Sequence, residues 1–303
     1  MSDSRTIRIY LDEKTLGRVL EGKHNFFGIV IHSLTSAGFE VDLQLDTPEE
    51  LEKSAGFAGY SLFYRRPPSH DRALDVRPAY IRPFWRIEAA AHRKDYVVAG
   101  KKFNPEKIDG PAARKFHNYW RKRLTGELAT PQGGDRVLVA LQGPLLEAEP
   151  GQAATQIQMA RETLSHDPYR KVVVRPQATA TYTAEEVAAL EELEQHPRVE
   201  ITLDALDPLL KSVDYVVTSD AAVAFRGLLF NRPAVMFGQA DCHHILENTA
   251  DVGVAAAFRE VTVKRRPYAK YFYWFLQLNS INAGRRDAGE RLLESCRLHG
   301  WKT

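Results

Sequence analysis

The sequence predicts an α/β protein in which parallel sheets are covered by crossover helices. Between residues 171 and 238, short apolar runs alternate with helix-like segments, which is typical of parallel strands joined by helices. The first 64 residues follow the order strand, helix, strand, helix, strand, which indicates another doubly wound sheet. A chain of 303 residues is long enough for two such domains.

Composition excludes several classes of protein. The formal net charge of +2 is too small to indicate a nucleic-acid partner, and we expect none. Two cysteines, Cys242 and Cys296, cannot form a disulfide scaffold, so we expect a reducing, cytoplasmic environment. The sequence has neither a run of about 18 apolar residues nor the apolar core of a secretion signal. We therefore expect no membrane span.

The elements of the first sheet are expected in the first 64 residues. Three strands are predicted, at 6–11, 39–45 and 60–64. Asn25 is a suitable cap for a helix that ends at Gly38, and Pro48 begins a short acidic helix. The polar segment 65–71 follows the third strand, and it either lines a ligand site or is a solvated, proline-rich loop.

Residues 80–88 are the most distinctive segment of the first half. The segment combines arginines, aromatic residues and a carboxylate, which suits a sugar or phosphate site. Arg82 can pair with an anion through its forked guanidinium, and Glu88 can accept a proton from a hydroxyl group. The alternative is a partly buried aromatic turn with an arginine–glutamate pair at the surface.

A basic helix and a linker complete the first half. The helix is expected at 111–124, where six basic residues alternate with aromatic ones. Such a helix either touches a membrane surface or polyanion, or is amphipathic with a solvated charged face. Residues 128–135 are rich in proline and glycine, so the domain boundary is predicted there.

The second half supplies the predicted ligand site. Strands are expected at 136–141, 172–174, 199–203, 215–217 and 234–238, and helices at 156–165, 184–194, 206–211 and 221–230. Open parallel sheets bind ligands at the carboxyl ends of their strands. The polar side chains predicted at those ends are Gln142, Arg175, Gln177, Ser219, Asp220 and Gln239.

Three further segments follow the last strand. Residues 241–244 contain an aspartate, a cysteine and two histidines, but adjacent side chains cannot easily share one ion, so no metal site is expected. A contact of His243 or His244 with a ligand is the alternative. The aromatic helix at 268–278 places Phe272, Phe275 and Leu276 on one stripe, which indicates core packing, with peripheral membrane contact as the alternative. A last amphipathic helix is expected at 285–298.

Several of these segments resemble a known family. Residues 80–88, Tyr-Ile-Arg-Pro-Phe-Trp-Arg-Ile-Glu, resemble the glycine-tyrosine-x-arginine-proline-x-tryptophan-x-x-x-glutamate segment of bacterial capsule polysaccharide biosynthesis and export proteins. Here Ala79 stands in place of that glycine. Residues 137–142 resemble that family's strand ending in glutamine, and residues 172–177 resemble its strand ending in lysine-proline-histidine-proline. Residues 215–238 resemble its asparagine-serine-threonine helix and the next strand. The resemblance covers about half of the chain.

The resemblance implies two Rossmann-like domains that face each other across a cleft, the GT-B arrangement, with a C-terminal helix crossing back to the first domain. It implies an acceptor domain at 1–128, a nucleotide-sugar domain at 135–266, and helices at 267–303 that pack on the first domain. It also implies transfer of a sugar such as 3-deoxy-manno-octulosonic acid (Kdo) from its cytidine monophosphate donor. The acceptor would be a saccharide or glycolipid.

The chain departs from the family pattern in its predicted donor site. Gln177 stands where the family has histidine, and it can form hydrogen bonds but cannot become a cation. Asp220 and Ala221 stand in place of asparagine-serine, and Arg226 replaces a glutamate. Arg226 lies seven residues after Ser219 on the predicted helix, so both face one side, where the arginine could pair with a second anionic group of the donor.

These observations leave two main functional hypotheses. The first is a glycosyltransferase of bacterial surface polysaccharide or its lipid-linked precursor. In it, Glu88 is the base or orients an acceptor hydroxyl, and Arg82 lies with it across the cleft. No cofactor beyond the nucleotide-sugar is expected, and the membrane contact would be peripheral, at the inner membrane. The second is a relative that kept the fold and a binding or regulatory role but lost catalysis. A dinucleotide-dependent enzyme is disfavoured, because no strand is followed by Gly-x-Gly-x-x-Gly.

Overall fold

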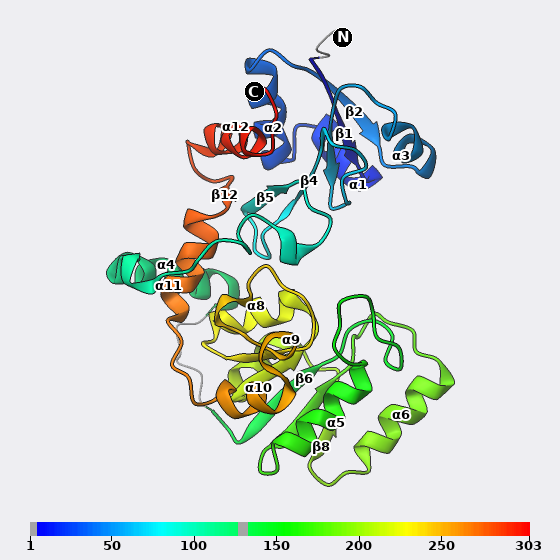
Figure 1. Ribbon diagram of the computed structural model, residues 1–303, viewed down its shortest axis with the longest axis vertical. Helices are drawn as coiled ribbons and strands as arrows, with labels where there is room; N and C mark the ends of the chain where they lie inside the picture. The colour runs from blue at the N-terminus through cyan, green and yellow to red at the C-terminus, as the bar shows by residue number, and fades with distance from the viewer. Residues whose placement is uncertain (1–4, 127–132) are drawn as a thin grey trace. The chain divides into compact units, whose positions relative to one another are not determined.

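The computed structural model describes residues 5–126 and 133–303, which form two compact α/β units (Figure 1). The first unit runs to Gly100 and also contains the chain from Phe275 onward, and the second extends from Lys101 to Trp274. The chain therefore returns to the first unit near its end, as predicted. The sequence analysis placed the first boundary at 128–135, and most of that segment lies outside the described residues.

The first unit contains a mixed six-stranded sheet. Its strands are β1 (Thr6–Leu11), β2 (Glu40–Leu45), β3 (Tyr60–Tyr64), β4 (Ala73–Pro78), β5 (Phe84–Glu88) and β12 (Ile281–Asn282). The order is β12-β5-β4-β3-β1-β2. Strands β1 to β4 are parallel to one another, and β5 is antiparallel to both β4 and β12. The three predicted strands are confirmed. Strands β4 and β5 were not predicted, because Pro78 and Pro83 interrupt the apolar pattern there.

Helices cover this sheet. They are α1 (Glu13–Leu20), α2 (Asn25–Ser36), α3 (Pro48–Ser54) and α12 (Ala288–Leu298), with a 3₁₀ turn at Arg93–Asp95. The cap of α2 is His24 rather than the predicted Asn25, whose amide instead donates to the Ala283 carbonyl at 3.0 Å. The ring of Phe26 stacks on Trp85 at 4.1 Å, and α12 lies beside α2 (Figure 1). The C-terminal helix therefore closes the core of the first unit.

The second unit contains a six-stranded sheet that is parallel throughout. Its strands are β6 (Arg136–Ala140), β7 (Lys171–Arg175), β8 (Val199–Ile201), β9 (Tyr215–Thr218), β10 (Ala234–Met236) and β11 (Glu247–Asn248). They are arranged in the order β11-β10-β9-β6-β7-β8. Read from β8, this is the 3-2-1-4-5-6 order of doubly wound nucleotide-binding sheets. All five predicted strands are confirmed, and β11 was missed because it has only two residues.

The helices of the second unit follow the predicted alternation. They are α4 (Gly110–Thr125), α5 (Gln156–His166), α6 (Ala184–Glu194), α7 (Leu206–Ser212), α8 (Ala221–Leu229), α9 (Thr249–Val252), α10 (Val254–Val261) and α11 (Tyr268–Tyr273), with 3₁₀ turns at Pro105–Lys107 and His243–Ile245. Capping boxes at Thr155 and Thr183 fix the starts of α5 and α6. These signals explain why the helix boundaries were predictable.

The aromatic segment after Arg266 is core, as its spacing predicted. Helix α11 continues into a π-helical turn, Trp274–Leu278, and the side chains of Phe272, Phe275 and Leu276 are fully buried. Phe272 packs at 5.2 Å from the ring of His117 on α4 and at 5.5 Å from Phe225 on α8. Helix α4 is amphipathic, with its aromatic side against α11 and most of its charges solvated.

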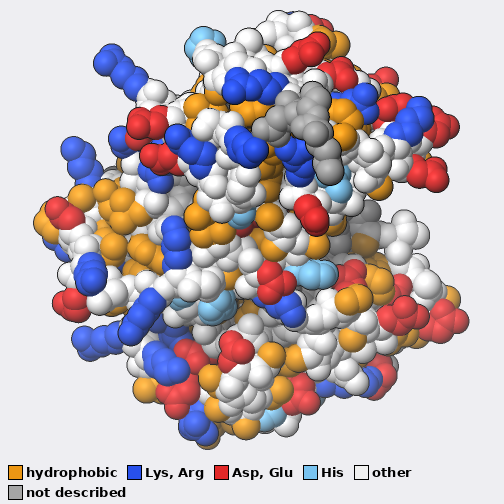
Figure 2. Space-filling view, turned by 45° about the horizontal axis from the view of Figure 1, so that its top comes forward, with side chains coloured by type: hydrophobic (Ala, Val, Ile, Leu, Met, Phe, Trp, Pro, Cys, Tyr) orange, Lys and Arg blue, Asp and Glu red, His pale blue; other side chains and the backbone are white. Residues whose placement is uncertain are grey.

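Charges of both signs are mixed on the face that Figure 2 shows, where lysine and arginine side chains are interspersed with aspartate and glutamate side chains. On this face they do not form a basic stripe of the kind that follows a nucleic-acid backbone. Within residues 5–126 and 133–303, no helix combines the length and the apolar character needed to cross a bilayer.

Replacement of His117 with glutamine should make the protein less sensitive to acid. Burial lowers the pKa of His117 from 6.5 to about 4, so the unfolded chain takes up a proton before the folded protein does. The contribution of His117 to the free energy of unfolding is therefore complete above pH 6.5. As the pH falls towards 4, this contribution decreases by on the order of 3 kcal/mol. Glutamine can still donate to the Leu228 carbonyl, which His117 Nε2 meets at 3.1 Å.

The measurement is the free energy of unfolding in denaturant between pH 4 and pH 7, with the exposed His92→Gln as the matched control. Asp75 acts in the opposite direction in both proteins, because burial raises its pKa to about 6 and its contribution is lost as the pH rises from about 4 to 6. The difference between the wild type and His117→Gln isolates the histidine. Parallel pH profiles for the wild type and His117→Gln would contradict the lowered pKa of His117.

Candidate functional site

The sheet of the second unit has a switch point between β6 and β9. From β6 the chain builds outward through β7 to β8, and from β9 it builds in the other direction through β10 to β11. The helices that follow β6 and β9 therefore leave on different faces, which opens a crevice outside the carboxyl ends of these two strands. Gln142 follows β6 and Ser219 follows β9, so both predicted residues lie at this point.

Gln156 joins the two sides of the switch point. Its carboxamide oxygen accepts a hydrogen bond from the Gln142 backbone N–H at 3.1 Å, and its nitrogen donates to Ser219 Oγ at 2.9 Å and to Gln152 Oε1 at 3.2 Å. The side chain of Gln156 is only 1% exposed. Gln156 was not among the residues predicted from the sequence. The capping box at Thr155 was the signal, because it places Gln156 at the start of α5, beside the strand ends.

The end of β7 contributes Gln177 but directs Arg175 elsewhere. Gln177 Oε1 accepts from the Gly143 backbone N–H at 3.2 Å, so Gln142, Gln177 and Ser219 belong to one connected polar region. Arg175 Nε donates to the Asp204 carbonyl at 2.8 Å, in the loop after β8. The structure therefore brings together three of the predicted residues, Gln142 through its backbone N–H and Gln177 and Ser219 through their side chains, whereas Arg175 is bound at the neighbouring loop.

The N-terminus of α8 is capped by the chain itself. Asp220 Oδ1 accepts from the Ala222 backbone N–H at 2.6 Å, and the Asp220 N–H donates to Thr218 Oγ1 at 3.1 Å. A helix N-terminus favours anions, but here the carboxylate of Asp220 already occupies part of that position. A phosphate at this site would have to approach beside a negative charge.

Arg226 is paired within the unit. Its guanidinium binds the carboxylate of Asp207 through two nitrogens, with Nε at 2.8 Å from Oδ1. To meet an anionic group of a ligand, Arg226 would have to leave this carboxylate or share it. The sequence analysis placed Arg226 on the correct helix but could not identify Asp207, which comes from α7.

A loop of residues 143–155 covers part of the carboxyl edge. The Ala153 N–H donates to the Phe237 carbonyl at 2.8 Å, which holds the loop over β10. A side chain on Gly151 would lie 2.9 Å from Cδ of Gln239, so this glycine allows the loop to pass over the exposed Gln239. Gln239 is therefore at the rim of the site, with the loop on its other side.

The predicted residues of the first unit lie at opposite ends of β5. Arg82 is exposed, with its guanidinium 5.9 Å from the ring of Trp85 and 3.5 Å from the Tyr64 hydroxyl. Glu88 is 3% exposed and accepts from the Val97 backbone N–H at 2.9 Å. The strand between them spans roughly 13 Å. The structure does not bring these two residues together, and Glu88 is in a buried network.

That buried network contains a residue that the sequence analysis missed. Asp75 on β4 is opposite Glu88 in the strand pairing, is fully buried, and is paired with Arg77. Burial raises the pKa of Asp75 to about 6, in spite of Arg77 and the hydroxyl of Tyr96. Carboxyl groups with raised pKa values occur at catalytic sites and in structural networks alike. Here the network ties residues 93–97 to the sheet.

The histidines after β10 have structural partners. His244 Nε2 lies 2.8 Å from the Lys101 carbonyl and its Nδ1 lies 3.0 Å from the Tyr271 hydroxyl, while His243 Nδ1 lies 3.1 Å from the Ala240 carbonyl. Among the described residues, no cluster of three or more histidine, cysteine, aspartate or glutamate side chains is suited to a metal ion.

Replacement of Gly238 with alanine should disrupt the switch point. A Cβ atom on Gly238 would lie 2.2 Å from the Ser219 carbonyl oxygen, so the backbone after β9 would have to move. We expect a loss of roughly 1–3 kcal/mol in the free energy of unfolding. The matched control is Gly28→Ala in α2, where a Cβ meets nothing within 4 Å. Equal stability of the two variants would show that the close contact is not a constraint.

Comparison with solved structures shows which known proteins share this fold. Chain-wide similarity is found to Thermosulfurimonas dismutans KpsC, beta Kdo 2,7 transferase, with a TM-score of 0.54, 14% identity, and coverage of 95% of this chain and 99% of that chain. The beta Kdo 2,4 transferase of the same KpsC has a TM-score of 0.49 and 13% identity, with 89% of each chain covered. No protein-family model matches the sequence, and no curated protein matches it significantly. The chain has the fold of the Kdo transferases, of the GT-B type.

Proposed function

We propose that this protein is a glycosyltransferase that moves a sugar from a nucleotide-activated donor to a bacterial surface polysaccharide or its lipid-linked precursor, with Kdo as the first donor sugar to test. The observation that carries the proposal is the polar region around Gln156, which lies at the switch point of a sheet with nucleotide-binding strand order. The fold shared with the Kdo 2,7 transferase supports the choice of donor.

In this proposal the second unit binds the nucleotide-sugar. Ser219 Oγ and the carboxamides of Gln142 and Gln177 offer neutral hydrogen-bond donors to phosphate and ribose oxygens. The start of α8 adds its dipole. Catalysis by such a site depends on stabilising the leaving phosphate. The hydrogen bond from Gln156 holds the Ser219 hydroxyl in a fixed position for this role. The first unit would bind the saccharide or glycolipid acceptor.

The alternative function is binding without turnover, and three observations favour it. Arg226 is paired with Asp207, Glu88 is buried, and the charge that phosphate would prefer near α8 is replaced by the carboxylate of Asp220. A protein with these features can keep a nucleotide or saccharide site and lack an effective base. We place either function in the cytoplasm, in agreement with the two free cysteines, Cys242 and Cys296.

The experiment combines binding and turnover. Thermal shifts with cytidine, uridine and guanosine mono- and diphosphates test for the nucleotide site, and release of cytidine monophosphate from CMP-Kdo with an acceptor saccharide tests for transfer. Nucleotide binding with turnover supports the transferase. Nucleotide binding without turnover supports the alternative. No shift with any nucleotide would overturn the transferase and the nucleotide-binding form of the alternative.

Replacement of Asp220 with asparagine should strengthen nucleotide binding. Asparagine caps helices as well as aspartate does, so the bond to Ala222 is kept, while the charge that opposes a phosphate is removed. We expect the Kd for the bound nucleotide to fall roughly five- to tenfold.

Ser219→Ala should instead weaken binding about fivefold or more, because it removes a hydroxyl at the proposed phosphate position. Ser165→Ala, at the exposed far end of α5, is the control and should leave the Kd unchanged. Calorimetric titration measures all three variants. An unchanged Kd for both Asp220→Asn and Ser219→Ala would exclude the start of α8 as the phosphate site.

A further inference from the structure

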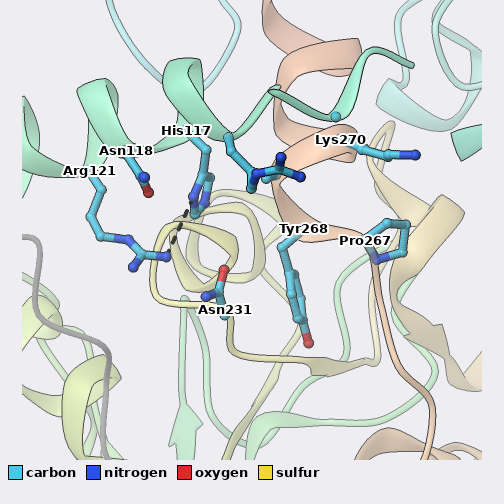
Figure 3. Close-up of a pocket in the computed structure, with 10 residues that line it drawn as sticks. His117, Asn118, Arg121, Asn231, Pro267, Tyr268 and Lys270 are labelled. Atoms are coloured by element: carbon cyan, nitrogen blue, oxygen red, sulfur yellow. Dashed lines mark hydrogen bonds between the residues drawn. The ribbon is translucent and has the colours of Figure 1, made fainter. Parts of the chain in front are cut away.

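The second unit contains a separate cavity between α4, α11 and the turn after α8. It has a volume of about 590 Å³ and is open to solvent. In Figure 3, His117, Asn118 and Arg121 extend from α4, Asn231 lies on the turn, and Tyr268 and Lys270 extend from the start of α11. The lining residues are Gly110, Arg114, His117, Asn118, Arg121, Asn231, Pro267, Tyr268, Ala269 and Lys270.

The lining is cationic and contains no aspartate or glutamate. Arg114 is exposed, and among the described residues its guanidinium has no hydrogen-bond or ion-pair partner. Lys270 donates from Nζ to the Pro105 carbonyl at 2.8 Å, and no carboxylate in the described part of the chain pairs with its ammonium group. Both Arg114 and Lys270 lie close to Gly110, since a Cβ there would meet Arg114 Nη1 at 3.3 Å and Lys270 Cε at 3.7 Å.

Arg121 is the buried member of this group. Its side chain is only 6% exposed, and burial lowers its pKa. Nε donates to the Leu229 carbonyl at 2.6 Å, and Nη2 lies 3.5 Å from Nδ1 of His117. Within the described part of the chain, no carboxylate pairs with this guanidinium. A buried charge without a counterion is costly, and in known structures such charges are paired.

Part of this charge is compensated by α8. Arg121 and His117 bind the carbonyls of Leu229 and Leu228, at the C-terminus of that helix, where the dipole is equivalent to about half a negative charge. Binding to the end of α8 therefore explains part of the positive charge in the cavity, that of Arg121. It does not explain Arg114 and Lys270, which line the same cavity. Among the described residues, neither of them forms a hydrogen bond with the last carbonyls of α8.

We propose that this cavity binds a phosphate group, carried either by a soluble molecule or by a lipid headgroup. The two arginines offer forked donors that match phosphate oxygens, the lysine offers a point charge, and the amides of Asn118 and Asn231 offer neutral donors. A volume of about 590 Å³ accommodates a phosphate together with the group it is attached to. The bound dianion supplies the counterion that no carboxylate of the described residues gives to Arg121.

The cavity is distinct from the proposed donor site. Asp220, at the start of α8, is at the carboxyl edge of the sheet, whereas Asn231 follows the end of α8 and precedes β10 at the amino edge. The nine residues of α8 separate these edges by roughly 13 Å. Phosphate binding in the cavity is therefore a second binding activity, and it does not depend on whether the donor site is occupied.

The test compares Arg114→Gln, Arg121→Gln and Arg123→Gln in the full chain. Each variant removes one positive charge from α4, but Arg123 is exposed and does not line the cavity. Inorganic phosphate and pyrophosphate are titrated at constant ionic strength and followed by thermal shift and calorimetry. We expect Arg114→Gln and Arg121→Gln each to weaken binding about tenfold or more, and Arg123→Gln to leave it unchanged.

Arg114→Gln keeps the test independent of folding, since this exposed side chain does not bind α8. Co-sedimentation with vesicles of phosphatidylcholine, with and without phosphatidylglycerol, identifies the source of the phosphate. Binding of soluble phosphate that is lost in both cavity variants establishes a soluble ligand. Binding only to phosphatidylglycerol vesicles, with the same loss, establishes a headgroup. Equal behaviour of all three variants, or binding to none of these probes, overturns the proposal.

Discussion

A sheet whose strands are all parallel must present every strand's carboxyl end at one edge, and this constraint organises the second unit. The apolar cores of β6 and β9 are fully buried and pair directly, so their ends, Gln142 and Ser219, emerge side by side. Because the crossover helices then depart on different faces, they leave a crevice between these ends. A side chain has to satisfy the polar groups there, and Gln156 does so.

Gln156 explains why the groups at the switch point are polar but neutral. Its carboxamide is buried and uses both its oxygen and its nitrogen on the two strand ends, so neither Gln142 nor Ser219 is left with an unsatisfied group in the interior. This arrangement is neutral. Nearby charges, on Arg175, Asp220 and Arg226, are bound to other parts of the same unit. A nucleotide in this site would meet preorganised neutral donors rather than free cations.

At the opposite edge lie cations that no carboxylate of the described residues neutralises. There the long α4 lies against α11 and the end of α8, and its aromatic side chains fill the interface while Arg114 and Arg121 reach a common cavity. One helix thus has two functions in the architecture. It contributes His117 and Phe116 to the packing of the unit, and it gathers positive charge where the sheet presents its amino ends.

The sequence by itself determined the α/β class, the parallel strands of the second unit, and the starts of α5 and α6, because apolar periodicity and capping boxes act over a few neighbouring residues. It also placed Gln142, Gln177 and Ser219 at one edge, since the direction of a parallel strand fixes where its last residue lies. Only the tertiary structure decided that Glu88 is buried opposite Asp75, that Arg226 is held by Asp207, and that Gln156 joins two strand ends. These relations connect residues that are 13 to 63 positions apart or lie on separately formed elements, and no local pattern encodes which partner a long polar side chain will find.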